Sequence, residues 1–180
     1  MMYRKLLNSE LGRPDLEQYR GIEKEAVAVV LDNVRSQHNI GSAFRTSDAF
    51  RVSKLLLCGI SATPPSPEIH KSALGAEFSV EWEHYDDTLE ALKALRAEGY
   101  TLVAIEQAEN SLPLKDFATR VLESGEKVAL VFGNEVKGVG QQAVDMCDLC
   151  VEIPQWGTKH SLNVSVTVGI VLYSISRLVF

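Results

Sequence analysis

Short apolar runs that alternate with helical patterns constrain the fold of this chain more than any other feature of its sequence. The candidate strands are residues 26–31, 54–58, 78–82, 100–105, 127–132 and 149–153. Helical patterns lie between them at residues 41–50, 88–98 and 141–146. Such alternation is typical of an α/β domain with a largely parallel sheet. We therefore predict a mostly parallel sheet with helices on both of its faces.

The length and composition fit one globular domain with a short extension. The chain has 180 residues, of which 46% are hydrophobic and 23% are charged, and a chain of this kind can bury a substantial core. Residues 1–24 are polar and mixed, so we expect a short N-terminal extension with helical structure, followed by one domain at residues 25–180. No apolar segment has the length and continuity of a signal peptide or a membrane span, and we expect a cytoplasmic protein.

The three cysteines fit a reducing compartment and do not form a recognisable metal site. Cys58, Cys147 and Cys150 are an odd set, which favours reduced thiols. Cys147 and Cys150 have the spacing of half a zinc site, but no second pair follows and the four histidines are scattered. We therefore expect core cysteines and no bound metal.

Charge is distributed unevenly along the chain. The formal net charge is −6, yet residues 81–126 alone contain eleven acidic and four basic residues. Once these are subtracted from the totals of 24 and 18, the rest of the chain carries 13 acids and 14 bases. A locally basic surface that binds nucleic acid is therefore compatible with the acidic total.

The C-terminal segment from Ser161 fits two structures. The sequence SLNVSVTV alternates as a half-buried strand does, but about twenty residues are too many for one strand. Ser161, Ser165 and Gly169 recur every four residues and would form a ridge of small side chains on a helix, which another element could approach closely. We predict a helix that starts near Ser161, with Ser161 as its N-cap.

Three stretches rich in glycine and polar residues follow predicted strands, where open parallel sheets place their ligands. The first is residues 33–50. In this stretch Asn39 could cap a helix, and the guanidinium of Arg45 could bind a phosphate through bidentate hydrogen bonds. The second is residues 131–140, whose glycine spacing matches neither the Walker pattern nor the dinucleotide fingerprint. It is a glycine turn that a flat ligand could approach, with Glu135 at its rim. The third is residues 153–163, where Pro154 ends a strand.

Taken together, the three stretches resemble the ordered motifs of a known family. The patterns are N-x-G-x-x-x-R-T at 39–46, F-G-N-E-x-x-G at 132–138 and I-P-x-x-G-x-x-x-S-L-N-V-S-V at 153–166. They are similar to the three motifs of the SpoU/TrmH branch of the SPOUT RNA methyltransferases. The resemblance implies an α/β domain whose C-terminal part forms a deep trefoil knot, an exception to the rule against threaded chains. It also implies a homodimer that binds S-adenosylmethionine and methylates a ribose 2′-hydroxyl of tRNA or rRNA.

The resemblance also implies which residues form the site. The cofactor-binding positions, which act mainly through backbone atoms, are Gly133, Ile153 and Leu162. The catalytic positions are Asn39, Arg45, Glu135, Ser161 and Asn163, and all five residue types match the family pattern.

Arg45 is expected to orient the RNA rather than to remove a proton. A guanidinium group stays protonated in nearly all protein settings, so it is better suited to bind the phosphate beside the target hydroxyl. Ser161 and Asn163 would then hydrogen-bond to Arg45 or Glu135. Two alternatives stay open at this point. One is a knotted methyltransferase that acts on a base and does not need Arg45, and the other is an RNA-binding module without activity.

Partners are expected on two surfaces. The apolar face of the C-terminal helix would be exposed in a monomer, which predicts a homodimer; its members are Val164, Val168, Leu172 and Phe180. RNA phosphates would contact positively charged residues near the three motifs, namely Arg35, Arg45, Lys71 and Lys159.

Overall fold

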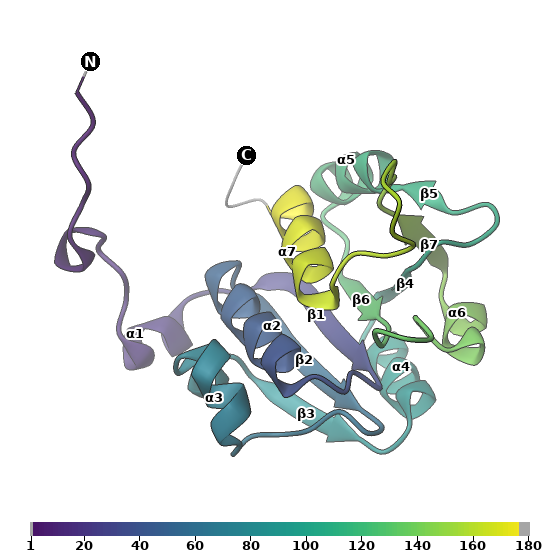
Figure 1. The fold of residues 1–180 in the computed structure, drawn as a ribbon, viewed down its shortest axis with the longest axis horizontal. Coiled ribbons are helices and arrows are strands. Elements are labelled where there is room, and N and C mark those ends of the chain that lie inside the picture. The colour runs from purple at the N-terminus through teal and green to yellow at the C-terminus, as the bar shows by residue number, and fades with distance from the viewer. Residues whose placement is uncertain (1, 177–180) are drawn as a thin grey trace.

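The computed structural model describes residues 2–176, which form a parallel sheet covered by helices on both faces (Figure 1). The strands in this part of the chain are β1 (Glu25–Asp32), β2 (Val52–Cys58), β3 (Trp82–Tyr85), β4 (Thr101–Ile105), β5 (Leu112–Pro113), β6 (Val128–Phe132) and β7 (Leu149–Glu152). They lie in the order β3-β2-β1-β6-β4-β7-β5, and every neighbouring pair is parallel. The predicted mostly parallel α/β sheet is confirmed.

Two hydrophobic cores lie on the two faces of this sheet. The helices α2 (Gln37–Ala49), α3 (Pro67–Ala73), α5 (Leu114–Ser124) and α7 (Val164–Ile175) cover one face, and α4 (Thr88–Ala97) and α6 (Gln141–Met146) cover the other. Alternate residues of β1 enter different cores, with Val29 in the first and Val30 in the second, because successive strand side chains point to opposite faces. A strand buried on both faces must be apolar throughout, which explains why such strands could be predicted from apolar runs in the sequence.

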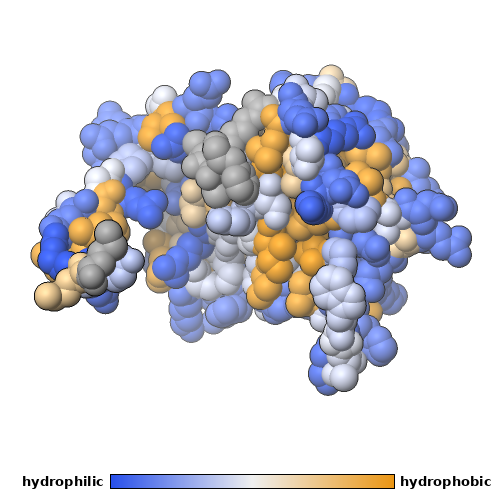
Figure 2. Space-filling model, turned by 90° about the horizontal axis from the view of Figure 1, so that it is seen from above, coloured by the Kyte–Doolittle hydropathy of each residue, from blue (hydrophilic) through white to orange (hydrophobic). Residues whose placement is uncertain are grey.

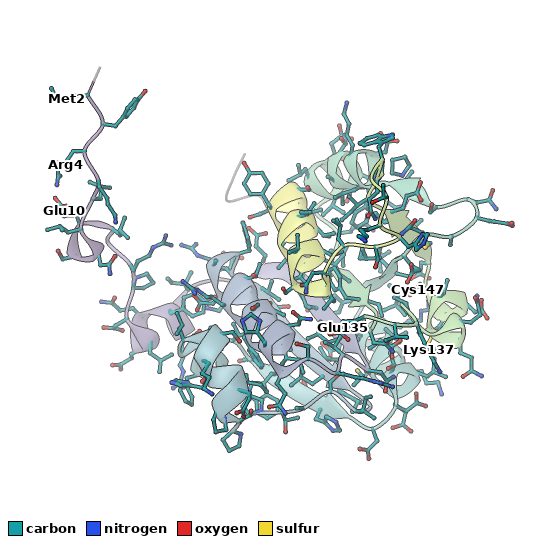
Figure 3. All side chains as sticks on the ribbon, in the orientation of Figure 1. Met2, Arg4, Glu10, Glu135, Lys137 and Cys147 are labelled. Atoms are coloured by element: carbon teal, nitrogen blue, oxygen red, sulfur yellow. The ribbon has the colours of Figure 1, made fainter. Side chains whose placement is uncertain are left out.

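The N-terminal residues lie beside the domain rather than within it (Figure 1). The described part contains a 3₁₀ turn, η1 (Asn8–Glu10), and a short helix, α1 (Leu16–Gly21). Figure 3 shows Arg4 and Glu10 far from the rest of the chain, and these two side chains form an ion pair of 2.8 Å. Tyr19 attaches the segment to the domain, because it is buried and its hydroxyl donates to the carbonyl of Asp48 (2.8 Å) at the end of α2.

One predicted strand is misplaced, and α3, α5 and β5 were not predicted. Residues 78–82 were expected to be extended, but the strand begins only at Trp82 and a 3₁₀ turn, η2 (Ala76–Phe78), precedes it. Gly75 enters this turn with a positive φ of 96°. Its N–H donates to the buried carboxylate of Glu77 (3.0 Å), so a local side-chain contact replaces strand pairing here.

The C-terminal helix is confirmed, but its expected exposure is wrong. Val164, Val168 and Leu172 were predicted to be exposed in a monomer, whereas they are buried in the core that α7 shares with α2 and α5. Phe180 lies outside the described residues. The outward-facing apolar residues of α7 are instead Val166 and Tyr173, which are 50% and 53% exposed. Across residues 2–176, the helices are all too short or too polar to cross a membrane.

Close helix packing occurs at Gly41 rather than at the predicted ridge. A Cβ added at Gly169 would lie 4.0 Å from Thr46 Cγ2 of α2, which is an ordinary contact. A Cβ at Gly41 would overlap with Ser72 Oγ and with the carbonyl oxygen of Ile69, both on α3. Close packing of α2 against α3 therefore requires a glycine at position 41. The backbone carbonyl of Ile69 could not move aside for a larger residue as a flexible side chain could.

We predict that Gly41→Ala destabilises the protein by up to about 2 kcal/mol, because overpacking costs roughly 1–3 kcal/mol and the gain in helix propensity offsets only about 1 kcal/mol of it. Urea unfolding measures this free energy. Gly21→Ala in α1 is the matched control, since nothing lies within 4 Å of a Cβ added there. Equal effects of the two substitutions would contradict the close packing at Gly41.

Candidate functional site

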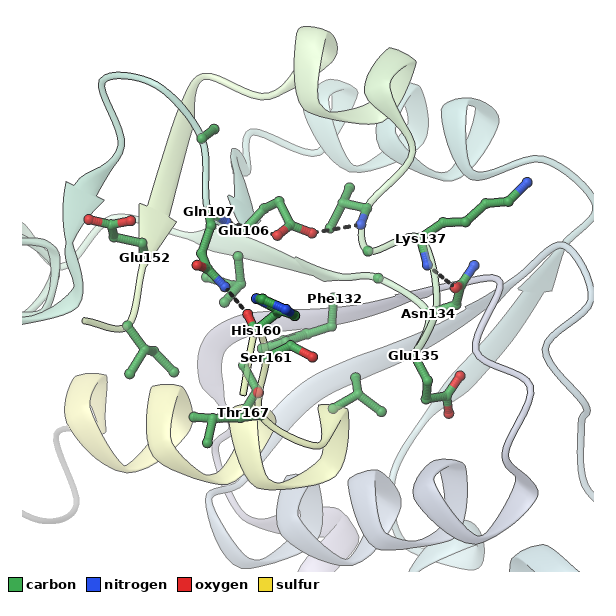
Figure 4. A pocket seen from close by; sticks show the side chains of 18 of the residues that line it. Glu106, Gln107, Phe132, Asn134, Glu135, Lys137, Glu152, His160, Ser161 and Thr167 are labelled. Carbon is green, nitrogen blue, oxygen red and sulfur yellow. Dashed lines mark hydrogen bonds between the residues drawn. The ribbon is translucent and has the colours of Figure 1, made fainter. Parts of the chain in front are cut away.

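A cavity of about 500 Å³ opens at the carboxyl ends of β4, β6 and β7 (Figure 4). Parallel strands bring their carboxyl ends to one edge of the sheet, where such sites usually lie. The residues that end or follow these strands, Glu106, Gly133 and Ile153, line the cavity together with the segment that precedes α7. Figure 4 shows Gln107 bound to this segment, where its amide nitrogen donates to the carbonyl of His160 (2.7 Å).

Residues 133–140, the glycine loop, form one wall of this cavity and fold back on themselves. Asn134 and Gly138 exchange backbone hydrogen bonds of 3.2 and 3.0 Å, and Asn134 Oδ1 accepts from the N–H groups of Val136 and Lys137. A Cβ at Gly133 would overlap with the backbone of Gly138 and Val139. The glycine is therefore required by the loop's contact with itself, and that contact leaves main-chain atoms along the cavity wall.

Two carboxylates from other segments hold the glycine loop in place. Glu106 Oε2 accepts from Val139 N (3.0 Å), as the dashed line in Figure 4 shows, and its Oε1 accepts from Gln107 N (2.8 Å). Asp32, which is buried at the end of β1, accepts from Gly140 N through Oδ2 (2.8 Å). Neither residue was among the predicted site residues. Their positions as the acidic residues at or directly after the ends of β1 and β4 were the available signal.

Glu135 connects the glycine loop to the start of α2. Its Oε1 accepts from Asn39 Nδ2 (2.9 Å). Burial raises the pKa of Glu135, but hydrogen bonds from its own N–H, from Asn39 and from the backbone of Arg35 and Ser36 outweigh burial and lower it. The contact therefore stabilises the fold above the ordinary pKa of a glutamate and is lost as pH falls through the lower pKa of the folded state. The side chain is exposed, so the contribution is small.

Asn163 extends this connection to the start of α7. Its Nδ2 donates to Asn39 Oδ1 (3.2 Å), so one hydrogen-bonded chain joins Glu135, Asn39 and Asn163. The predicted caps are wrong in both helices. Asn163 caps α7 by accepting from Ser165 N (2.9 Å), in place of Ser161. Ser36 caps α2, and Asn39 lies inside the first turn of that helix with its side chain directed to Glu135.

Ser161 and Arg45 stand apart from this hydrogen-bonded chain. Ser161 lines the cavity, but within residues 2–176 its hydroxyl makes no hydrogen bond, and Asn163 binds neither Arg45 nor Glu135 directly, contrary to expectation. Arg45 is exposed on α2, six residues beyond Asn39, which is about 120° around the helix. Its guanidinium forms no ion pair or hydrogen bond in the described part of the chain and is available to an external ligand.

The three residues expected to bind a cofactor do line one cavity. Gly133 contributes from the glycine loop, Ile153 from the end of β7 and Leu162 from the segment before α7. Apolar side chains of Ile105 and Phe132 complete the walls. The arrangement offers a flat ligand apolar surfaces and main-chain polar groups, which is the usual composition of a small-molecule site.

The described residues form no cluster of three or more His, Cys, Asp or Glu side chains that could hold a metal ion. Burial, followed by the nearby charge of Asp148, raises the pKa of Cys147 to about 12. A thiol with a raised pKa is a poor metal ligand, because the thiolate is the binding form. Cys150 instead donates to the carbonyl of Glu106 (3.4 Å). The absence of a bound metal stays a prediction.

The comparisons with known proteins agree with one another. The SpoU rRNA Methylase family matches residues 26–173. The tRNA (guanosine(18)-2′-O)-methyltransferase of Thermus thermophilus is 29% identical over 169 residues, which are 94% of this chain and 84% of that protein. The 23S rRNA (guanosine-2′-O-)-methyltransferase RlmB of Nitrosomonas europaea is 32% identical over 157 residues, which are 87% of this chain and 58% of that protein.

A solved structure has the same fold. The AdoMet-bound rRNA methyltransferase from Sinorhizobium meliloti superposes with a TM-score of 0.78 at 28% identity, covering 90% of this chain and 60% of that one. The chain spans 62%, 65% and 58% of the length of three of the relatives that it matches, so these relatives contain additional residues.

We predict that Glu106→Gln loosens the glycine loop. A glutamine offers only one oxygen to the two N–H groups that the carboxylate now binds, so the loop should lose about 1 kcal/mol of local stability. Hydrogen exchange at the Val139 amide measures this loss and should accelerate several-fold. Glu109→Gln, at an exposed residue of the same connection, is the matched control. Unchanged Val139 exchange in Glu106→Gln would show that this carboxylate does not hold the loop.

Proposed function

Because the chain belongs to the SpoU rRNA methylase family, we propose that it is an RNA methyltransferase that methylates a ribose 2′-hydroxyl of tRNA or rRNA. The observation that carries this proposal is the hydrogen-bonded chain of Glu135, Asn39 and Asn163, which stands beside the cavity that Gly133, Ile153 and Leu162 line. The relatives named as guanosine 2′-O-methyltransferases support the choice of ribose over base.

The cavity fits S-adenosylmethionine, which is bound in the structure of the Sinorhizobium relative. A volume of about 500 Å³ lies within the usual range for small-molecule sites. Ile105, Phe132 and Ile153 offer apolar surface to an adenine ring, and the glycine loop offers main-chain groups. S-adenosylmethionine supplies an electrophilic methyl group. No metal is needed for this chemistry, and we expect binding to persist in the presence of a chelator.

The side chains outside the cavity serve the RNA. A ribose hydroxyl is a weak nucleophile, so positioning it accounts for much of the rate enhancement. Arg45 has an uncommitted guanidinium that suits the phosphate beside the target ribose. Asn39 and Asn163 fix the neighbouring helix starts and leave Ser161 at the cavity to bind the substrate or the cofactor.

RNA binding is expected on this face despite the acidic total charge. Within the described residues Arg35, Arg45 and Lys159 form no ion pair, and Lys71 makes only a loose one of 3.8 Å with Glu68. Binding through phosphate contacts releases counterions, so RNA affinity should fall steeply with salt.

We further propose that residues 25–180 form the methyltransferase domain with residues 1–24 as an extension, that the protein acts in the cytoplasm, and that the C-terminal part is knotted. Support for the knot comes from the path of the last segments. β7 lies between β4 and β5, and the chain then returns to place α7 against both α2 and α5. The α2 and α7 starts meet through Asn39 and Asn163.

We predict that Arg45→Ala lowers kcat for methyl transfer by about two orders of magnitude or more, the scale for loss of one preorganised group that acts in the transition state. Affinity for S-adenosylmethionine, measured by calorimetry, should stay within a few-fold. The matched control is Arg13→Ala, which removes the same charge from an exposed position in the N-terminal segment.

The outcomes of the Arg45 experiment separate the candidate functions. Loss of cofactor binding with normal turnover at saturating cofactor would show that Arg45 does not serve the RNA. Methylated bases in place of methylated riboses, detected by mass mapping, would indicate a base methyltransferase. RNA binding without transfer by the wild-type protein would indicate a binding module.

We also propose a homodimer, supported by the apolar surface that α7 leaves outside the core. Figure 2 shows apolar side chains on one face of the molecule. The large hydrophobic residues that α7 exposes are Val166 and Tyr173. Tyr173 packs edge-on against the ring of Phe50, with centroids 6.3 Å apart, so α2 borders the same surface. A second copy would cover this surface.

We predict that sedimentation finds a dimer and that Val166→Glu shifts the equilibrium towards monomer, because a buried unpaired carboxylate opposes association. Ile60→Glu is the matched control, since it places the same charge at an exposed aliphatic residue outside α7. A wild-type protein that sediments as a monomer at every concentration would exclude the dimer.

A further inference from the structure

A second cavity, of about 340 Å³, lies on the other side of the glycine loop. It lies at the carboxyl end of β1, between the starts of α4 and α6. Asn134, Lys137 and Gly138 line both cavities, so the loop is the wall between them. None of the residues assigned to the cofactor or to catalysis lines the second cavity.

Both acids of the second cavity are committed to the fold, as are the side chains of Asn33, Thr88 and Asn134. Asp32 is buried and accepts from Thr88, Asn33 and Gly140. Asp87 caps α4 by accepting from Leu89 N (3.0 Å). Neither acid needs a ligand to satisfy it, so the recognition chemistry of the cavity comes from the other side chains.

The lining side chains that make no hydrogen bond or ion pair with the described residues are aliphatic, amide and cationic. Ile60 is 60% exposed and Leu89 is half-buried, so both offer apolar surface. Gln142 is exposed, and its amide makes no hydrogen bond with the described residues. Arg35 and Lys137 are exposed and form no ion pair there. Apolar surface for a flat ring, an amide for its polar edge and cations for a phosphate together match the chemistry of a nucleotide.

The position of the cavity points to a nucleotide within an RNA strand. The carboxylate of Glu135 accepts from the side chain of Asn39 (2.9 Å), and the backbone N–H groups of Arg35 and Ser36 lower the pKa of this carboxylate. One side chain therefore separates the proposed target site at Asn39 from Arg35, which lines the second cavity. Figure 3 shows Glu135 and Lys137 close together on the glycine loop between α2 and α6. A strand whose target ribose lies at Asn39 would pass over Arg35 into this cavity.

We propose that the second cavity binds the base and phosphate of a nucleotide that neighbours the methylated one. This inference rests on the proposed function, because it assumes that RNA is the substrate. It makes Ile60, Gln142 and Arg35 specificity residues, since single-stranded RNA is recognised through unstacked bases held in such sites. The glycine loop would then contact the cofactor on one side and the RNA on the other.

Ile60→Glu tests the proposal without touching the cofactor cavity or the catalytic positions. The probe is unmodified tRNA and rRNA from cells that lack the protein, with RNA binding measured by filter retention and methyl transfer measured with labelled cofactor. We expect the Kd and KM for RNA to rise about ten-fold, the scale for loss of one base contact. The KM for cofactor should stay within about two-fold, because cofactor contacts are untouched. Gln142→Ala should weaken RNA binding by about three-fold, the scale of one neutral hydrogen bond.

Leu11→Glu is the matched control, because it adds the same charge at an exposed aliphatic residue of the N-terminal segment. Equal urea midpoints for both variants establish that each is folded. If Ile60→Glu binds and methylates RNA as Leu11→Glu does, the second cavity does not hold RNA, while the proposed function stands. If the wild-type protein methylates no RNA but Ile60→Glu still weakens RNA binding, the methyltransferase assignment fails and the RNA site stands.

Discussion

The anchoring of the glycine loop by carboxylates is the interaction on which the rest of the site depends. Glu106 binds the loop at Val139, Asp32 binds it at Gly140, and Glu135 extends from it to the start of α2. A loop of this composition has much conformational freedom, and a glycine loses more backbone entropy on ordering than any other residue. Charge-assisted hydrogen bonds to main-chain N–H groups offset part of that entropy without filling the adjacent space. Two cavities are left on the two sides of the loop as a result.

The parallel sheet explains why these groups meet. All its strands end at one edge, so residues that are far apart in the sequence become neighbours there. The start of α2 and the start of α7 lie at that edge as well, joined through Asn39 and Asn163. Helix starts carry unpaired N–H groups and partial positive charge, which suits the carboxylate of Glu135. The same electrostatics that hold the fold together therefore order the proposed catalytic residues.

In the proposed function, main-chain groups serve the cofactor and side chains serve the RNA. The proposed cofactor cavity is built from apolar walls and loop backbone, and its size and composition suit S-adenosylmethionine. The uncommitted cations Arg35, Arg45 and Lys137 lie outside its apolar walls or at its border, where a polyanion could reach them. Such a division would allow a protein with a net charge of −6 to bind RNA, because contacts to phosphate depend on local charge rather than on the total.

The sequence by itself determined the elements whose pattern is local, and the tertiary structure decided the contacts between them. Strands buried on both faces must be apolar throughout, so β1, β2, β4 and β6 were predictable. The partly buried β7 was predicted as well, as were α4 and α6. The short edge strand β3 was misplaced, because a single contact between Gly75 and Glu77 favours a turn there. The caps of α2 and α7 were assigned to the wrong residues, since neighbouring polar side chains compete for one N–H group and their distant partners decide the outcome.

Dependence on distant partners also limited how much of the site could be predicted. Motif spacing predicted Gly133, Glu135 and Asn163 as site residues, but it could not show that Asp32 and Glu106 hold the loop. Those bonds join positions 108 and 33 residues apart. Nor could an apolar helix pattern tell which face of α7 is covered within the chain, because that depends on where α2 and α5 pack. Sequence periodicity indicates which residues form a helix or strand with their neighbours. Only the folded sheet determines which distant groups those residues contact.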